Sequence, residues 1–246
     1  MKKKKNIRIF QSVNDLAKFA LEWLTVKMEK TPEEKLFTVA LSGGTTPKQL
    51  FQYIALHGQQ SIDWKRMLFF WSDERCVLPD STDSNYRMAR LCFLDKLDIP
   101  EKHIFRIHGE AAPAQESQRY SRILSEKILS QNGLPRFDLI LLGLGEDGHT
   151  ASIFPGNIQL FQSDRLCEVV KHPQTGQLRI TLTGPVINNA AEVAFLVTGS
   201  GKAEIVSKVL NKGKTDDPAS LVCPNDGRLT WLLDKDAAPD FIHWSL

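Results

Sequence analysis

In Leu139-Ile140-Leu141-Leu142-Gly143-Leu144-Gly145-Glu146-Asp147-Gly148-His149-Thr150-Ala151-Ser152, a short apolar run passes directly into a glycine-rich segment that carries Asp147 and His149. A continuously apolar strand is typical of a parallel sheet that is covered on both faces. In such sheets ligands bind in the crevice at the carboxyl ends of the strands. The segment therefore predicts a buried strand over residues 137–142 that delivers His149 to a ligand site. A tight turn with an exposed histidine is the alternative interpretation.

The rest of the chain alternates between strand and helix patterns. Further strands are predicted at residues 7–10, 36–41, 67–71, 178–182 and 193–197. Helices are predicted after the capping candidates Ser12 and Asn14, from Pro47 onward, and at residues 85–97, 113–129 and 201–210, with a loop at 211–217. Alternation of this kind favours the α/β class with a mainly parallel sheet, and we expect a single domain over residues 1–246.

The composition is that of an ordinary globular protein, with 42% apolar and 24% charged residues among 246. A net charge of +2 gives no reason to expect a nucleic-acid partner. No apolar run approaches the roughly 20 residues that span a bilayer. The lysines at positions 2–5 precede no apolar segment, so we expect a frayed end and not a signal peptide.

The four cysteines, at positions 76, 92, 167 and 223, are widely scattered and form no C-x-x-C pair. Neither a zinc site nor a redox dithiol is indicated. Reduced thiols fit a cytoplasmic protein best.

A second glycine-rich turn, Ser42-Gly43-Gly44-Thr45-Thr46-Pro47, joins a predicted strand to a predicted helix. Backbone N–H groups at such a junction converge on anions, and the helix dipole adds positive potential. The pattern matches neither the P-loop nor G-x-G-x-x-G, so a single phosphate group is a better prediction than a nucleotide. A plain turn before a capped helix is the alternative.

Charged residues follow or begin three further strands. They are Asp73, Glu74 and Arg75 after residues 67–71, Arg179 in the strand at 178–182, and Lys202 in Gly199-Ser200-Gly201-Lys202. Arginine forms bidentate contacts with phosphate, and lysine supports it as a point charge. Taken singly, each could be a surface ion pair or a solvated side chain; together they favour a site for an anionic ligand.

These motifs, in this order over nearly the whole chain, closely resemble the 6-phosphogluconolactonase family. The block Gly145-Glu146-Asp147-Gly148-His149-Thr150-Ala151-Ser152 carries most of the resemblance, whereas the Ser-Gly-Gly block is shared with related sugar-phosphate enzymes. The resemblance implies hydrolysis of 6-phosphogluconolactone to 6-phosphogluconate, the second step of the oxidative pentose phosphate pathway. It also implies a Rossmann-like sheet with helices on both faces, as in hexosamine-6-phosphate deaminases, and no metal or organic cofactor. We expect a cytoplasmic monomer or weak homo-oligomer.

Lactone hydrolysis needs an activated water and a site for the developing oxyanion. His149 is the predicted base, which would then return its proton to the departing ring oxygen. Asp147 or Asp73 would orient the imidazole, and the sequence leaves both open. Arg75, or backbone N–H groups of the 143–148 turn, would stabilise the oxyanion.

The remaining site residues would hold the substrate. Its phosphate would lie among Ser42, Gly43, Gly44 and Thr45 of the first turn, together with Arg179 and Lys202. Either residues 80–86 or residues 158–164 could close over the bound lactone, and the sequence does not decide between them.

Two other functions are compatible with parts of the pattern. A glucosamine-6-phosphate deaminase would carry Asn-Glu-Pro after its Asp-Gly-His, but Phe154 stands where that glutamate would be, and an apolar ring transfers no proton. A non-catalytic sugar-phosphate sensor would need a DNA-binding segment, for which the sequence leaves no room before its first predicted strand.

Overall fold

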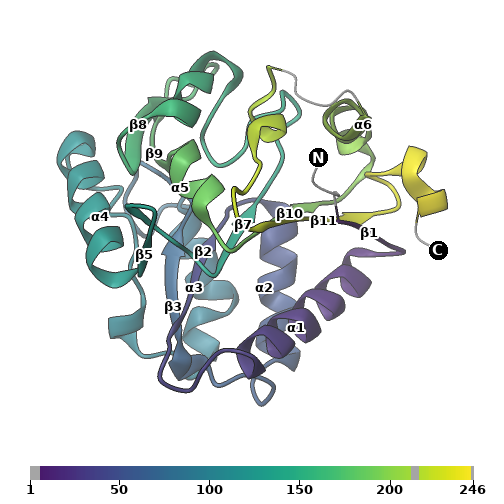
Figure 1. Ribbon diagram of the computed structural model, residues 1–246, viewed down its shortest axis with the longest axis horizontal. Helices are drawn as coiled ribbons and strands as arrows, with labels where there is room; N and C mark the ends of the chain where they lie inside the picture. The colour runs from purple at the N-terminus through teal and green to yellow at the C-terminus, as the bar shows by residue number, and fades with distance from the viewer. Residues whose placement is uncertain (1–5, 212–215, 245–246) are drawn as a thin grey trace.

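The computed structural model describes the backbone of residues 6–211 and 216–244. The lysines at 2–5 lie outside the described residues, as do positions 212–215 of the predicted loop. The centre of the molecule is a six-stranded parallel sheet in the order β1-β11-β10-β7-β2-β3 (Figure 1). Its strands are β1 (Asn6–Phe10), β2 (Phe37–Leu41), β3 (Met67–Trp71), β7 (Leu139–Leu142), β10 (Glu192–Val197) and β11 (Arg228–Asp234).

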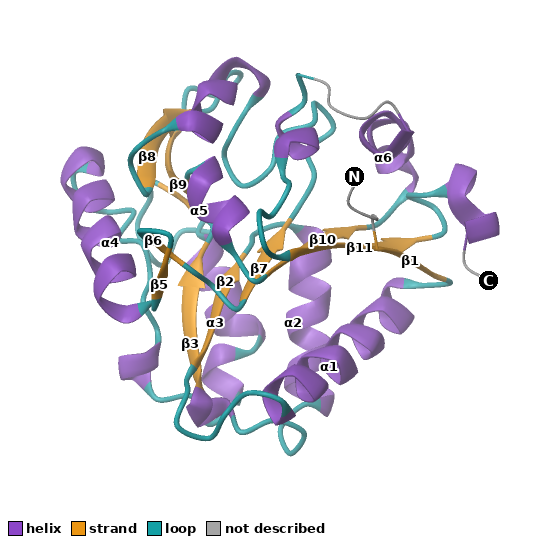
Figure 2. Cartoon of the chain, in the orientation of Figure 1, coloured by secondary structure: helices purple, strands orange, loops and turns teal. Residues whose placement is uncertain are grey.

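Helices cover both faces of this sheet, which confirms the predicted architecture. They are α1 (Val13–Glu29), α2 (Thr45–His57), α3 (Asn85–Cys92), α4 (Pro113–Lys127), α5 (Gly184–Asn189) and α6 (Ala203–Asn211). Figure 2 shows α1 and α2 on one side of the sheet, with α5, α6 and the strands β8 and β9 on the other. Short 3₁₀ turns lie at Trp64–Arg66, Leu94–Lys96, Glu101–His103, Pro155–Gln162, Ser200–Lys202, Pro218–Leu221 and Pro239–Trp244.

A second, antiparallel sheet lies beside the main one in the order β4-β9-β8. Its strands are β4 (Asp73–Arg75), β8 (Cys167–Lys171) and β9 (Leu178–Leu182). The strand predicted at 178–182 is therefore present, but it pairs outside the parallel sheet, with Arg179 opposite Arg75. A two-stranded hairpin, β5 (Ser130–Gln131) and β6 (Leu134–Pro135), completes the strands of the described chain.

Several predicted element ends are corrected by the structure. Ser12 caps α1, as one of the two predicted candidates, and accepts a hydrogen bond from the backbone of Asp15. Helix α2 begins at Thr45, so Pro47 is its third residue and not its first. Helix α3 ends at Cys92, because Phe93 leaves helical geometry before the short 3₁₀ turn. Asn132 and Gly133, which follow the helix predicted at residues 113–129, form the tip of the β5–β6 hairpin, and both have positive φ.

The core forms on the two faces of the parallel sheet because side chains alternate along each strand. On one face Val39 and Leu41 of β2, with Phe69 of β3, meet α1 and α2 around a small apolar cavity. On the other face Phe195 stacks on Trp231 with ring centroids 4.0 Å apart. All residues of β2, β3, β7 and β10 are buried, as the continuous apolar pattern predicts for strands covered on both sides.

The free edge of β3 is satisfied by groups from outside the sheet. The N–H of Phe105 donates to the carbonyl of Phe69 at 2.8 Å. The hydroxyl of Tyr120, from α4, accepts from the N–H of Trp71 at 2.8 Å and donates to its carbonyl at 3.1 Å. One fully buried hydroxyl thus serves both backbone groups of the last residue in the strand.

We predict that Tyr120→Phe lowers the free energy of unfolding by about 1–3 kcal/mol, because it leaves both polar groups of Trp71 buried without a partner. Urea unfolding followed by fluorescence measures the change. Tyr53→Phe is the matched control, since the Tyr53 hydroxyl makes no hydrogen bond within the described chain and should have little effect. Equal stability of the two variants would contradict the assigned role.

Candidate active site

A pocket of about 640 Å³ opens at the carboxyl ends of the parallel strands. The chain runs from β2 through α2 to β3 on one side, and from β7 toward β10 on the other, so the order of connection reverses between β2 and β7. Ligands bind at such topological switch points in open α/β sheets. The turns that follow β2 and β7 meet here, and the space where a Cβ of Gly143 would lie is within 3.8 Å of the Ser42 hydroxyl oxygen.

The 42–45 turn leads into the N-terminus of α2. Gly44 occupies the capping position with a φ of 104°, and no side chain caps the helix. The first N–H groups of α2 are therefore left to solvent or to a ligand. The helix dipole adds positive potential at the same point. A phosphate group matches both properties.

His149 lies in the turn that follows β7. Its Nδ1 is 2.5 Å from Oδ1 of Asp147, and the same oxygen accepts the backbone N–H of His149 at 3.1 Å. Partial burial raises the pKa of Asp147, but the hydrogen bonds and charge of His149 outweigh this effect and hold it below its ordinary value. The carboxylate is therefore ionised near neutral pH, so Nδ1 carries the proton and Nε2 is the free base of the neutral ring.

The imidazole is held between a glycine and an aromatic ring. A Cβ at Gly145 would lie 2.1 Å from Nδ1 of His149, so only glycine allows the ring to lie where it does. The ring of Phe154 also packs against the imidazole, with ring centroids 4.9 Å apart. Phe154 is buried, and it also contacts the ring of His172 and the guanidinium of Arg179.

Arg75 and Arg179 face each other across the β4–β9 pair. Nη1 of Arg75 donates to the carbonyl of Asp83 at 2.6 Å, whereas Nη1 of Arg179 is 3.4 Å from the hydroxyl of Ser152. Burial lowers the pKa of Arg179, and the charge of Arg75 lowers it further. Neither arginine forms an ion pair with any carboxylate in the described chain, and both Nε atoms are buried without a partner. The pair therefore favours binding of an anion.

Asp73 is a buried residue of β4, the strand that also carries Arg75. Its Oδ2 accepts the hydroxyl of Ser152 at 2.6 Å, and Ser72 lies 3.5 Å from its other oxygen. No hydrogen bond joins Asp73 to His149 in the described chain. Of the two carboxylates that the sequence left open, the one in contact with the imidazole is Asp147.

The turn after β10 brings Lys202 to the pocket. Both carboxylate oxygens of Asp234, at the end of β11, accept the N–H of Gly199, at 2.9 and 3.1 Å, and so fix this turn. Nζ of Lys202 lies 3.8 Å from Oε1 of Glu146, which is 78% exposed. Such an exposed pair is weak, so Lys202 is available to an anionic ligand.

The structure brings almost all of the predicted site residues together. Ser42, Gly43, Gly44, Thr45, Asp73, Arg75, His149, Arg179 and Lys202 line the pocket, and Asp147 contacts it through His149. Sequence reasoning missed Asn85, Thr198 and Asp234, which also line it. Asn85 begins a predicted helix, but nothing in the local pattern marks it as a pocket residue. Asp234 ends a strand that the pattern did not indicate.

A match to a family model is consistent with this arrangement. Residues 11–231 match the family described as glucosamine-6-phosphate isomerases/6-phosphogluconolactonase. The chain belongs to this family. It is 43% identical over 223 residues to a 6-phosphogluconolactonase of Synechocystis, an alignment that covers 89% of this chain and 90% of the relative. The resemblance to 6-phosphogluconolactonases is thereby confirmed.

Solved structures of the family extend the comparison. The 6-phosphogluconolactonase of Trypanosoma brucei superposes with a TM-score of 0.86 at 30% identity, covering 96% of this chain and 98% of that one. A monomeric glucosamine-6-phosphate deaminase superposes with a TM-score of 0.80 at 23% identity, covering 94% of this chain and 98% of that one. The latter likeness shows a common fold, as the sequence predicted.

No group of three or more histidine, cysteine or acidic side chains among the described residues is arranged to hold a metal ion. Among the described helices, none has the length and apolar character that crossing a membrane requires.

We predict that inorganic phosphate raises the melting temperature of the protein, because a ligand of the folded state alone stabilises it by mass action. At a phosphate concentration of about 100 times the Kd, the free energy of unfolding rises by about 2.7 kcal/mol. This corresponds to a rise of several degrees in Tm for a chain of this size. Differential scanning fluorimetry against potassium chloride of equal ionic strength measures the shift. Lys202→Ala should reduce it, whereas Lys18→Ala, on exposed α1 surface, should not. An undiminished shift in Lys202→Ala would remove that lysine from the phosphate site.

Proposed function

We propose that the protein hydrolyses 6-phospho-D-glucono-1,5-lactone to 6-phospho-D-gluconate, the second step of the oxidative pentose phosphate pathway. The observation that carries the proposal is the hydrogen bond between Nδ1 of His149 and Asp147, in a pocket that also holds two arginines and a lysine. It supplies a base, and the cations supply sites for the negative charges of substrate and transition state. Family membership and the named relatives support the same reaction.

In the first step, Nε2 of His149 takes a proton from a water molecule that attacks the lactone carbonyl. Asp147 stabilises the imidazolium that forms and keeps the ring in the required tautomer. The protonated His149 then returns its proton to the ring oxygen as the C–O bond breaks. A positioned acid–base group of this kind contributes about 10²–10⁴-fold to the rate.

The developing oxyanion is stabilised by Arg75. The alternative donors are backbone N–H groups of the 143–148 turn, but two of them are already used. The N–H of Gly145 donates to the carbonyl of His149, and that of Gly148 donates to the carbonyl of Gly145. The Arg75 guanidinium lines the pocket and has no carboxylate partner in the described chain, which favours it for this role.

The substrate phosphate binds at the 42–45 turn, with Arg179 and Lys202 as its cationic partners. This anchor is remote from the reacting carbon, so its binding energy holds the lactone carbonyl against His149 and Arg75. The small-molecule substrate is the partner that the site requires. The four cysteines are all unpaired, and free thiols are typical of proteins in the reducing cytoplasm. We therefore propose a cytoplasmic location.

The two alternatives are less compatible with the geometry. In the deaminase reaction a glutamate would be needed where Phe154 stands, and Phe154 is 1% exposed and packed against His149. A pure sensor would have no use for an imidazole oriented by a carboxylate. Neither alternative accounts for the Asp147–His149 pair as well as lactone hydrolysis does.

We predict that His149→Ala lowers kcat by about 10²–10⁴-fold, the contribution of a positioned base. The assay generates the lactone in place with glucose-6-phosphate dehydrogenase and detects product with 6-phosphogluconate dehydrogenase and NADP. The spontaneous hydrolysis rate is subtracted. His57→Ala, at the end of α2, is the matched control and should retain wild-type turnover. A His149→Ala enzyme with near-normal turnover would exclude this histidine as the base.

We also predict that Lys202→Ala weakens turnover of the phosphorylated lactone much more than that of glucono-1,5-lactone, which carries no phosphate for the lysine to bind. Comparing kcat/KM for the two lactones, in wild type and variant, measures the difference. An equal loss for both substrates would mean that Lys202 acts on some other part of the sugar.

A further inference from the structure

Glu74 is a buried carboxylate in β4, the strand that contributes Asp73 and Arg75 to the pocket. It is the middle residue of β4, between Asp73 and Arg75, which both line the pocket. Because side chains alternate along a strand, Glu74 points away from the pocket. It is 2% exposed and forms no ion pair in the described chain. The reaction proposed above gives it no role.

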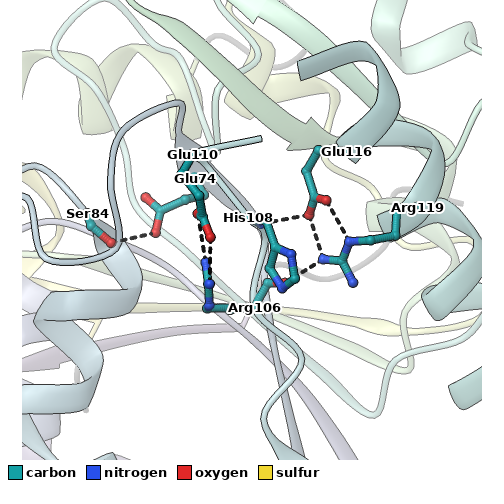
Figure 3. Close-up of polar contacts among 7 residues, drawn as sticks. All are labelled: Glu74, Ser84, Arg106, His108, Glu110, Glu116 and Arg119. Atoms are coloured by element: carbon teal, nitrogen blue, oxygen red, sulfur yellow. Dashed lines mark hydrogen bonds and ion pairs between the residues drawn. The ribbon is translucent and has the colours of Figure 1, made fainter. Parts of the chain in front are cut away.

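The Glu74 carboxylate binds the N-terminus of α3. It accepts the backbone N–H groups of Asn85 at 2.8 Å and Tyr86 at 2.7 Å. It also accepts the hydroxyl of Ser84 at 3.0 Å (Figure 3). It also accepts the N–H of Arg75 at 2.8 Å. Four donors thus converge on one side chain, and they tie β4 to the first turn of α3.

This connection places Asn85 in the pocket. Nδ2 of Asn85 donates to the carbonyl of Asp73 at 2.9 Å. The other side of the amide presses on the 42–45 turn, because a Cβ at Gly43 would lie only 1.9 Å from Oδ1 of Asn85. Asn85 therefore sets how closely that turn approaches the end of β3.

The same connection fixes the guanidinium of Arg75. Its Nη1 donates to the carbonyl of Asp83, two residues before α3 begins. A shift of the α3 N-terminus would move Arg75 and Asn85 together.

We propose that Glu74 is a positioning residue, which holds Asn85 and Arg75 so that the phosphate-binding turn and the oxyanion site lie at the separation that the substrate requires. The inference rests on the proposed function. The phosphate and the reacting carbonyl are at opposite ends of the substrate, so the separation of their two sites sets the attack geometry. A displacement of about 1 Å can cost about 10²-fold in rate.

The test compares Glu74→Gln with Asn85→Ala in the coupled lactonase assay. Glutamine places an amide NH₂ among N–H donors and so breaks part of the connection. We expect kcat to fall by about 10- to 100-fold in each variant, with KM and the Kd for inorganic phosphate close to wild type. A loss of folded protein would instead lower the number of phosphate sites per chain in proportion to kcat, so kcat is calculated per phosphate-binding site.

Glu116→Gln is the matched control. Glu116 is also 2% exposed, accepts the backbone N–H of His108 at 2.7 Å, and forms an ion pair with Arg119 (Figure 3). It does not line the pocket. Like Glu74→Gln, this variant replaces a buried carboxyl group by an amide, so it should reduce stability and leave kcat unchanged.

A double-mutant cycle then tests whether Glu74 acts through Asn85. If it does, the double variant loses no more kcat than the worse single variant. Losses that multiply, or a kcat near wild type in Glu74→Gln, would overturn the inference. If Glu74→Gln does not fold, Asn85→Ala decides alone, by a lowered kcat with unchanged phosphate affinity or by wild-type kinetics.

The wild-type assay separates the two levels of the argument. An active wild type with unaffected variants overturns the role of Glu74 alone. A wild type that adds nothing to the spontaneous rate overturns the proposed function, and the inference that rests on it as well.

Discussion

The parallel alignment of the six central strands is the constraint on which the rest of the structure depends. Parallel strands present all their carboxyl ends at one edge of the sheet, so the chain must turn at that edge after every strand. Ser42 follows β2, Ser72 follows β3, Gly143 follows β7 and Thr198 follows β10. Four turns from distant parts of the sequence are thereby brought to one pocket, and the strand register fixes their relative heights. The packing of the sheet therefore determines the geometry of the site.

Much of this arrangement could be predicted from the sequence, because fully buried strands leave continuous apolar runs and the turns after them carry glycine and polar residues. The runs in β2, β3 and β7 were found in this way. Strand β11 was missed because charged residues stand at both of its ends. The antiparallel pairing of β9 could not be predicted, since a strand pattern does not specify its partner.

The choice between Asp147 and Asp73 depended on side-chain geometry that the sequence does not contain. Both residues are acidic and both follow a predicted strand. The close approach of His149 to Gly145 turns the imidazole toward Asp147, whereas Asp73 is satisfied by Ser152 from elsewhere in the chain. Asn85 was missed for a similar reason. Its place in the pocket follows from the buried carboxylate of Glu74 on another strand, and no local pattern indicates that contact.

The way in which β3 ends also bears on how copies of the protein behave toward one another. An unpaired sheet edge can template a strand from a second molecule, and this is a common start of aggregation. Here the outward carbonyl of Phe69 and both outward groups of Trp71 are occupied by Phe105 and Tyr120. At Trp71, the last residue of β3, a strand from another molecule therefore finds neither backbone group free. Helix α4, which carries Tyr120, thus covers the backbone groups through which a second molecule would extend the sheet at this end of β3.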